Sequence, residues 1–189
     1  EYGTRAGGLL ENHKAKSLES LYAKYKSLTT EYGVKNINNF FSIRSSYIYG
    51  YKQRSGTLID LLIKCIKLKK EIQMTHCRIY RDYVFVDDVA NAFYNIIISE
   101  IPSGIYNVGS GKIITLKKLI LEISKKSGFD QKYLKFGKLA KKKEQKHPKS
   151  FMITKKINKY CGWKIKYSLE KGVNKILKFN KINLNMKKY

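Results

Sequence analysis

The sequence predicts an α/β fold, in which strands and helices alternate and helices cover a layer of strands. Two observations carry this prediction. Short runs rich in aromatic and β-branched residues alternate with stretches that have apolar residues at helical spacing. Glycine-containing turns separate several of these runs. With 189 residues, of which 43% are hydrophobic and 13% aromatic, the chain is long enough to form a core.

The first predicted helix covers residues 17–32. Ser17 is expected to cap this helix and Gly33 to end it. Its apolar residues recur at helical spacing: Leu18, Leu21, Tyr22, Tyr25 and Leu28. The same spacing places Tyr22 and Lys26, four residues apart, on one face of the helix.

Strands and helices then follow each other along the chain. Residues 37–50 have the aromatic and β-branched content of a strand, and residues 57–70 are apolar at helical spacing with basic residues in the last turn. Residues 80–98 begin as a strand and continue as a helix. Asp87 and Asp88 are expected to cap that helix rather than to act as a catalytic carboxylate pair.

A short strand and a glycine turn are predicted over residues 104–111. The stretch GSGK at the end of this turn lacks the upstream glycine and the following Ser or Thr of a phosphate-binding loop, so no such loop is predicted. A helix should begin at Thr115 and end at Gly128. Its apolar stripe consists of Leu116, Leu119, Ile120 and Ile123.

The last third of the chain has a different composition. Residues 135–150 are basic and have no helical or strand period, which indicates a loop or a mobile segment. Residues 152–179 predict a short helix, a turn at Gly162, and a final helix that begins near Ser168 with Glu170 in its first turn.

The chain is strongly basic. Its 39 Lys and Arg residues and 14 Asp and Glu residues give a formal net charge of +25. Such a charge would attract nucleic acid or an anionic membrane if the lysines gathered on one face. They are instead spread along the whole sequence, as the codon bias of an AT-rich genome would also produce. A basic nucleic-acid-binding module is therefore the least supported function.

Metal sites, disulfides and membrane segments are not predicted. The cysteines lie far apart without a C-x-x-C motif: Cys65, Cys77 and Cys161. The three histidines are also too scattered for a local metal motif. No apolar run approaches the roughly 18–20 residues of a membrane span, and no signal peptide is recognisable. These features indicate a cytoplasmic protein without a membrane partner.

Several motifs together resemble a known protein family. They occur in its order and spacing: EYG at 1–3, SLYAKYKS at 20–27, IRSSYIYG at 43–50, YRDYVFVDDVANAF at 80–93, GIYNVGSG at 104–111 and CGWKIKYSLEKGV at 161–173. RDYVFVDD at 81–88 is the most specific of them. The chain resembles the extended short-chain dehydrogenase/reductases, in the NAD-dependent epimerase/dehydratase group that acts on nucleotide sugars. The stretch YLKFGKLA and the last motif look most like the CDP-abequose synthase-like 4-keto-sugar reductases.

The resemblance implies a fold and a division into domains. The fold would be the C-terminal part of a Rossmann-type doubly wound parallel sheet plus a small α/β substrate-binding domain. Residues 1–55 would belong to the dinucleotide-binding domain. Residues 56–179 would belong mostly to the substrate-binding domain, with residues 80–98 returning to the Rossmann sheet. Residues 180–189 would be a frayed tail.

The resemblance also implies that Tyr22 and Lys26 are catalytic and cofactor-binding residues. Tyr22 would exchange a proton with the sugar hydroxyl while a hydride moves to or from NAD or NADP. A phenol holds its proton at neutral pH, and a cation one helical turn away favours the phenolate. Lys26 would supply that cation, and its ammonium would also hydrogen-bond the nicotinamide ribose.

Two further residues are implied to bind the nucleotide sugar. Arg81 matches the arginine that grips the diphosphate, a task suited to a forked, permanently charged guanidinium. A structural ion pair of Arg81 with Asp82 or Asp88 is the alternative. Tyr47 stands where the family commonly has Asn, so substrate positioning differs there. The loop Lys142-Lys143-Glu144-Gln145 stands where the family often has Arg-Pro-Asp-Glu.

One family feature is not found in the sequence. No G-x-x-G-x-x-G motif and no first βαβ unit appear, although these bind the dinucleotide in the family. The sequence therefore reads as the C-terminal part of an epimerase, dehydratase or 4-ketoreductase, and we expect these 189 residues alone to be poorly stable and inactive. The alternative is a degenerate relative without catalysis. A nucleotide-sugar substrate and a homodimer are the expected partners, and nucleic acid is not.

Overall fold

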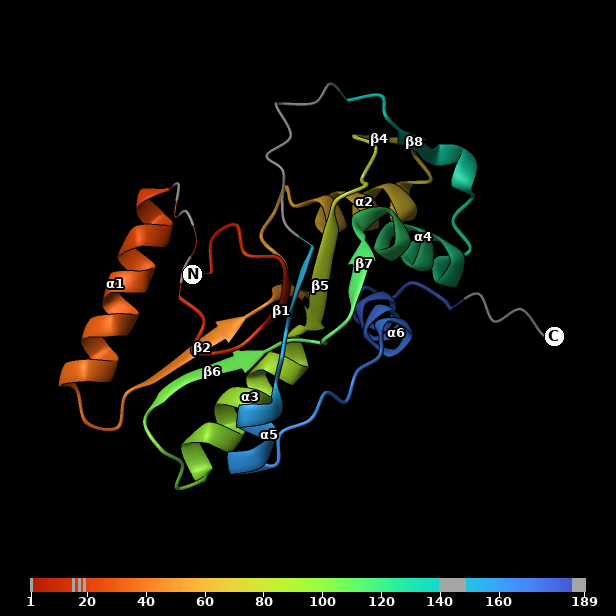
Figure 1. Cartoon of the computed structure of the whole chain (residues 1–189). Helices are drawn as coiled ribbons and strands as arrows, with labels where there is room; N and C mark the ends of the chain where they lie inside the picture. Colours follow the sequence, from red (N-terminus) through yellow and green to blue (C-terminus); the bar gives the residue numbers. More distant parts are fainter. Residues whose placement is uncertain (1, 15, 17, 19, 140–148, 185–189) are drawn as a thin grey trace. The chain divides into compact units, whose positions relative to one another are not determined.

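Strands and helices alternate in the computed structural model, which describes residues 2–14, 16, 18, 20–139 and 149–184 (Figure 1). The helices are α1 (Leu21–Asn36), α2 (Leu58–Leu68), α3 (Val86–Ile98), α4 (Leu116–Ser127), α5 (Lys155–Cys161) and α6 (Leu169–Phe179), with a 3₁₀ turn at Gln131–Tyr133. The strands are β1 (Gly7–Leu9), β2 (Phe41–Ser45), β3 (Tyr47–Tyr49), β4 (Ile72–Met74), β5 (Tyr80–Phe85), β6 (Gly104–Val108), β7 (Ile113–Thr115), β8 (Leu134–Phe136) and β9 (Ser150–Met152). Parallel pairing of β1 with β9, β2 with β6 and β4 with β8 confirms the predicted α/β class.

The chain forms two compact units, and each unit combines three separate stretches of sequence. Unit 1 consists of Glu1–Ile48, Arg81–Ile113 and His147–Lys166. Unit 2 consists of Tyr49–Tyr80, Ile114–Lys146 and Tyr167–Tyr189. The chain passes from one unit to the other within or beside β3, β5 and β7. The division into cofactor-binding and substrate-binding domains stays a prediction.

Unit 1 is built around the parallel pair β2 and β6. The register runs from Phe41 opposite Gly104 to Ser45 opposite Val108. In Figure 1, α1 lies on one side of this pair and α3 and α5 lie on the other. The core on the second side consists of Val84, Val89, Ala92, Ile96, Ile101, Tyr106, Val108, Ile157 and Trp163. Burial of each of the larger apolar side chains contributes roughly 1.5–3 kcal/mol.

Asp88 anchors a distant segment to the start of α3. The N-cap residue of α3 is Phe85 rather than either aspartate, and both aspartates lie in the first turn, where the helix dipole favours negative charge. The buried Asp88 Oδ1 accepts the backbone N–H of Lys166 at 2.8 Å, and the Asp88 carbonyl accepts the indole N–H of Trp163 at 3.0 Å. The segment after α5 is thereby fixed against α3.

Helix α1 begins and ends later than the sequence predicts. Its N-cap is Ser20, whose side chain accepts the N–H of Ala23 at 3.1 Å, whereas Ser17 lies outside the described residues. The prediction that Gly33 ends the helix is wrong, because α1 continues to Asn36. A Cβ atom at Gly33 would lie 2.3 Å from the ring of Phe40. Glycine is therefore needed there for close packing and not for a helix stop.

The faces of α1 are unusual for a helix on a sheet. Its buried residues are small: Ser27, Thr30 and Gly33. The Oγ1 of Thr30 lies 3.1 Å from the Oγ of Ser42 in β2. The large apolar side chains are exposed: Leu21, Tyr22, Tyr25, Leu28 and Tyr32. The apolar stripe seen in the sequence thus faces away from the core of unit 1.

Unit 2 contains three helices in the positions that the sequence predicts. Helix α4 packs against α2 and α6. Thr115 caps α4, and Gly128 ends it in a left-handed conformation with φ 67°. Ser168 caps α6, and Glu170 in its first turn pairs with Lys126. The fully buried residues of these helices are Leu62, Leu119, Ile120, Ile123, Val173, Ile176 and Leu177.

The predicted loop over residues 135–150 is partly replaced by strands. Strand β8 ends at Phe136, and β9 begins at Ser150. Residues 140–148, which include the loop Lys142-Lys143-Glu144-Gln145, lie outside the described residues. The predicted tail also lies in part outside them, because the description ends at residue 184.

Candidate functional site

Helix α1 presents Tyr22 and Lys26 together. The two residues are one helical turn apart, and the Lys26 Nζ lies 5.9 Å from the centre of the Tyr22 ring. Both side chains are exposed. The Ser20 cap fixes the start of the helix only two residues before Tyr22, so the phenol projects from a defined first turn.

Tyr22 and Lys26 line a cavity of about 270 Å³ in unit 1. The other lining residues are Tyr2, Ala23, Ile43, Arg44, Ser45 and Met152. Two cations and two phenols therefore border this cavity, and no carboxylate is among the described residues that line it. The local charge favours a ligand that carries negative charge or several hydroxyl acceptors.

A larger cavity of about 610 Å³ brings three of the four predicted site residues together. Tyr22, Tyr47 and Arg81 all line it. Lys26 lines the smaller cavity, which shares Tyr22 with the larger one. Strand β9 contributes part of the wall through Ser150, Phe151 and Met152. Residues that are widely separated in sequence thus converge on one region of unit 1.

Arg81 and Tyr47 form a stacked pair within the larger cavity. Strands β5 and β3, which carry them, are hydrogen-bonded neighbours. The Arg81 Cζ lies 4.4 Å from the centre of the Tyr47 ring, which is within cation–π range. The Tyr83 ring lies 6.3 Å from the Tyr47 ring and extends the aromatic group. Arg81 is only 9% exposed, whereas Tyr47 is 52% exposed.

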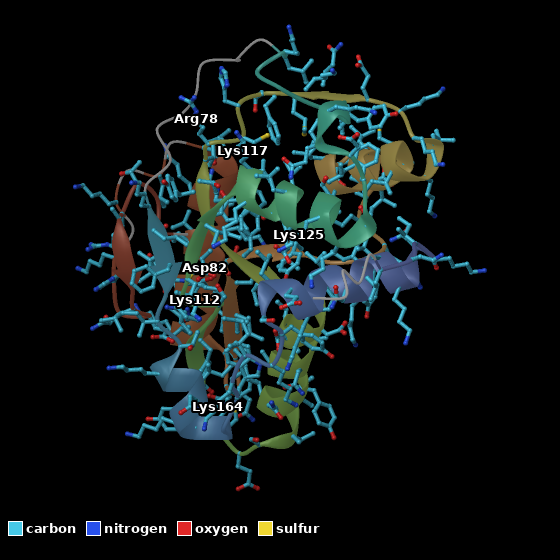
Figure 2. All side chains as sticks on the ribbon, turned by 90° about the vertical axis from the view of Figure 1, so that its right-hand side faces the viewer. Arg78, Asp82, Lys112, Lys117, Lys125 and Lys164 are labelled. Atoms are coloured by element: carbon cyan, nitrogen blue, oxygen red, sulfur yellow. The ribbon has the colours of Figure 1, made fainter. Side chains whose placement is uncertain are left out.

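Asp82 binds the glycine turn that the sequence compares with a phosphate-binding loop. Its Oδ1 accepts the N–H of Ser110 at 2.8 Å and the Ser110 hydroxyl at 2.6 Å. Its Oδ2 accepts the N–H of Gly111 at 3.2 Å and that of Met152 at 3.0 Å. Figure 2 labels Asp82 among the strands of unit 1. The donors of this turn therefore bind a carboxylate of the protein itself.

A second buried network was missed by the sequence analysis. The Tyr2 hydroxyl donates to Asn107 Oδ1 at 2.6 Å, and Asn107 Nδ2 donates to the carbonyl of Leu9 at 2.8 Å. The Arg44 Cζ lies 4.6 Å from the centre of the Tyr2 ring. Burial raises the pKa of Tyr2, and the neighbouring Arg44 and Asn107 offset this in part.

The motifs EYG and GIYNVGSG contain Tyr2 and Asn107, so their joint occurrence was the available signal. Their contact spans 105 positions in the sequence, which no local pattern predicts. Arg44 lies in β2, three positions before Tyr47. It adds a cation to the wall that Lys26 already lines.

Together these residues provide a phenol, an ammonium one helical turn away and a guanidinium that lies against an aromatic ring. Within the described part of the chain, no group of three or more His, Cys, Asp and Glu residues is placed to hold a metal ion. None of the helices among the described residues is both long and apolar enough to cross a membrane.

Comparison with known proteins identifies related sequences. Residues 20–109 match the model of the NAD dependent epimerase/dehydratase family. The chain is 32% identical over 143 residues to CDP-abequose synthase of Salmonella muenchen, and the match covers 73% of this chain and 47% of that protein. The chain thus spans about half the length of the curated relatives it matches.

Solved structures share the fold. The dTDP-glucose 4,6-dehydratase of Bacillus anthracis in complex with NAD has a TM-score of 0.80 and 18% identity, over 95% of this chain and 58% of that chain. RMD from Pseudomonas aeruginosa complexed with NADPH has a TM-score of 0.75 and 17% identity, over 91% of this chain and 59% of that chain. The α/β arrangement with parallel strands therefore matches Rossmann-type epimerase/dehydratase structures.

Proposed function

Because this chain belongs to the NAD dependent epimerase/dehydratase family, we propose that it forms part of a nucleotide-sugar epimerase, dehydratase or 4-ketoreductase. The convergence of Tyr22, Tyr47 and Arg81 on one cavity, with Lys26 one turn from Tyr22, is the observation that supports this. The similarity to CDP-abequose synthase favours the reductase among these three reactions.

Tyr22 is proposed to act as the general acid/base. Its hydroxyl would give a proton to, or take one from, a sugar oxygen bound in the larger cavity. Lys26, whose ammonium lies one helical turn away, would bind the same ligand beside the phenol. The exposure of both side chains is compatible with contact to a ligand.

The proposed cofactor is NAD or NADP, which when bound would accept or supply the hydride. The fit of this chain rests on the donor set of the smaller cavity, where the Lys26 ammonium offers three hydrogen-bond donors to ribose hydroxyls. Tyr22 borders the same cavity, so the Tyr22 hydroxyl would lie beside the ribose when the cofactor is bound.

Arg81 and Tyr47 are proposed to hold the diphosphate of the nucleotide sugar. The Tyr47 ring lies against the guanidinium, and a guanidinium directs its N–H groups in the plane of the group, where they can bind two oxyanion oxygens. The family commonly has Asn at this position. Tyr47 would instead help to position the substrate by orienting Arg81.

A homodimer is proposed to cover the exposed face of α1. The exposed apolar side chains of α1 that line neither cavity include Leu21, Tyr25, Leu28 and Tyr32. Contiguous exposed apolar residues of this kind mark interaction surfaces. Size measurement by light scattering, with Leu28→Glu as the disruptive variant, tests the proposal.

Nucleic acid and membranes are not proposed as partners. The labelled lysines in Figure 2 come from separate elements: Lys112 from the turn between β6 and β7, Lys117 and Lys125 from α4, and Lys164 from the segment after α5. The basic residues are spread along the whole sequence, so the net charge by itself does not support nucleic-acid binding. The cysteines are free, which supports a reducing, cytoplasmic location.

Ligand binding is the experiment that tests the proposed function. Calorimetric titration of the 189-residue chain with CDP, CDP-glucose, dTDP-glucose and UDP-glucose should show binding of at least one of them. Arg81→Ala should weaken that binding by about tenfold or more, because charge-assisted hydrogen bonds are lost. Arg78→Ala is the matched control, because Arg78 is an exposed arginine that does not line either cavity. No binding by any of these compounds would contradict the proposal.

Turnover is measured separately from binding. The same nucleotide sugars with NADPH or NAD test whether the 189 residues catalyse a reaction alone. We expect none, because the dinucleotide-binding motif of the family is not found in this sequence. Detectable nicotinamide-dependent turnover would overturn that expectation and leave the family function in place.

A further inference from the structure

We infer that Asp82 is the positioning residue of the larger cavity, holding the cavity wall around Arg81 in place. The identity of the ligand in this inference depends on the proposed function. The contacts of Asp82 come from the structure itself. Asp82 is 2% exposed and follows Arg81 directly in β5, and both residues line the cavity.

The contacts of Asp82 join three segments of unit 1. The two carboxylate oxygens accept from Ser110 and Gly111 in the glycine turn and from Met152 in β9. These segments lie 28 to 70 residues from Asp82 in the sequence. A single carboxylate therefore fixes β9, which supplies Met152 to the cavity wall, against the strand that carries Arg81.

The chemistry of the site requires a carboxylate. An ionised carboxylate is acceptor-only and can take two donors at each oxygen, as Asp82 does here. An asparagine at this position would keep one acceptor oxygen and turn an NH₂ group toward the remaining N–H donors. Those partly buried donors would then lose their acceptor.

Gly109 gives independent support for this placement. A Cβ atom at Gly109 would lie 2.6 Å from Asp82 Oδ2 and 2.7 Å from the Cβ of Met152. The backbone of the turn therefore approaches the carboxylate and β9 closely enough to exclude any larger residue. The contact is enforced from both sides, by hydrogen bonds and by close packing.

Substitution of Asp82 should loosen the wall locally and weaken ligand binding. In Asp82→Asn, amide hydrogen exchange at Ser110, Gly111 and Met152 should accelerate about tenfold or more, because the loss of hydrogen bonds to a charged acceptor has effects of this size. Affinity for CDP, measured by calorimetry, should fall by about tenfold. Exchange in β2 and β6 should stay unchanged.

Matched variants separate positioning from general stability. Asp60→Asn is the control, because Asp60 also accepts a backbone N–H, from Gly56 at 2.9 Å, and lies in unit 2. Ser110→Ala removes the hydroxyl donor and keeps the backbone contacts. Hydrogen exchange should therefore accelerate at the same amides, but by a smaller factor. If Asp82→Asn does not fold, Ser110→Ala still tests the contact.

The outcomes decide the inference in each case. Local acceleration together with weaker CDP binding supports it. Unchanged exchange at the three amides overturns the inference. Acceleration that spreads equally through β2 and β6 also overturns it. So does local acceleration without a loss of CDP affinity. If the unsubstituted chain binds no CDP, the proposed function fails on that ligand, and the exchange measurement alone decides whether Asp82 holds the wall.

Discussion

Lys26 lies one helical turn from Tyr22 on α1, with its Nζ 5.9 Å from the centre of the tyrosine ring. The pair is held on an exposed face of a helix whose opposite face packs on β2 and β6. The ammonium and the phenol are therefore close enough to contact one ligand, and both side chains are exposed.

Tyr22→Phe is predicted to abolish most turnover. In a catalytically active protein that contains these residues, loss of the hydroxyl should lower kcat by about 10²-fold or more, because general acid/base groups contribute on this scale. Substrate affinity should change little, since the ring remains. Tyr25→Phe is the control, because Tyr25 is exposed on the same helix and lines neither cavity. Equal kcat values for the two variants would contradict the assignment of Tyr22.

Tyr47 is predicted to act through its ring. Tyr47→Ala should weaken CDP binding by roughly 2- to 10-fold, because the cation–π contact that orients Arg81 is lost. Tyr47→Phe keeps the ring and should bind CDP as tightly as the unsubstituted chain. If Tyr47→Phe loses as much affinity as Tyr47→Ala in calorimetric titration, the hydroxyl and not the stack is responsible.

Gly33→Ala is predicted to destabilise the protein although alanine favours helices. The helix propensity gain is about 1 kcal/mol, but the added Cβ would lie 2.3 Å from the Phe40 ring. Overpacking of this kind typically costs about 1–3 kcal/mol. Urea unfolding should therefore show a net loss in the single variant and a smaller loss in Gly33→Ala/Phe40→Leu. A stabilised single variant would show that α1 can move away from Phe40.

Cys77 is predicted to be the least reactive cysteine. Its thiol is 3% exposed, and burial raises its pKa, while Thr75 and Lys117 lower it in part. A raised pKa means less thiolate at a given pH, so alkylation by iodoacetamide at pH values near 8 should be slow and should accelerate as pH rises. Mass spectrometry should find Cys65 and Cys161, which are less buried, modified first. Earlier modification of Cys77 would indicate that the segment between β4 and β5 opens readily.

The sequence predicted the helices of unit 2 well because their apolar stripes, caps and glycine stops agree with one another. Thr115, Gly128 and Ser168 lie at the ends where local rules place them. Strands of three residues, such as β1 and β9, are too short to show a period. For that reason residues 135–150 read as a loop in the sequence, although β8 ends at Phe136 and β9 begins at Ser150.

Helix α1 shows a different limit of sequence analysis. Periodicity identifies the apolar side of a helix but not the side that packs on the sheet. Here the sheet takes the small residues, among them Ser27 and Gly33. The glycine that looked like a stop is required by Phe40, and this contact is visible only in three dimensions.

The site was predicted in part. The motifs indicated Tyr22, Lys26, Tyr47 and Arg81, and the structure brings three of them to one cavity. The roles of these residues stay predictions. The bonds of Asp82 to Ser110 and Met152 could not be foreseen, because they join positions 28 and 70 residues apart.

The interleaving of the two units has a consequence for biosynthesis. The walls of the larger cavity extend from Tyr2 to Met152 in the sequence, so a ribosome must translate most of the chain before the cavity can close. During synthesis, α1 and β2 emerge before β6, the partner of β2. Strand β1 emerges long before its partner β9. Contacts over such separations form late and slowly, and the exposed strand edges of the nascent chain are then candidates for chaperone binding.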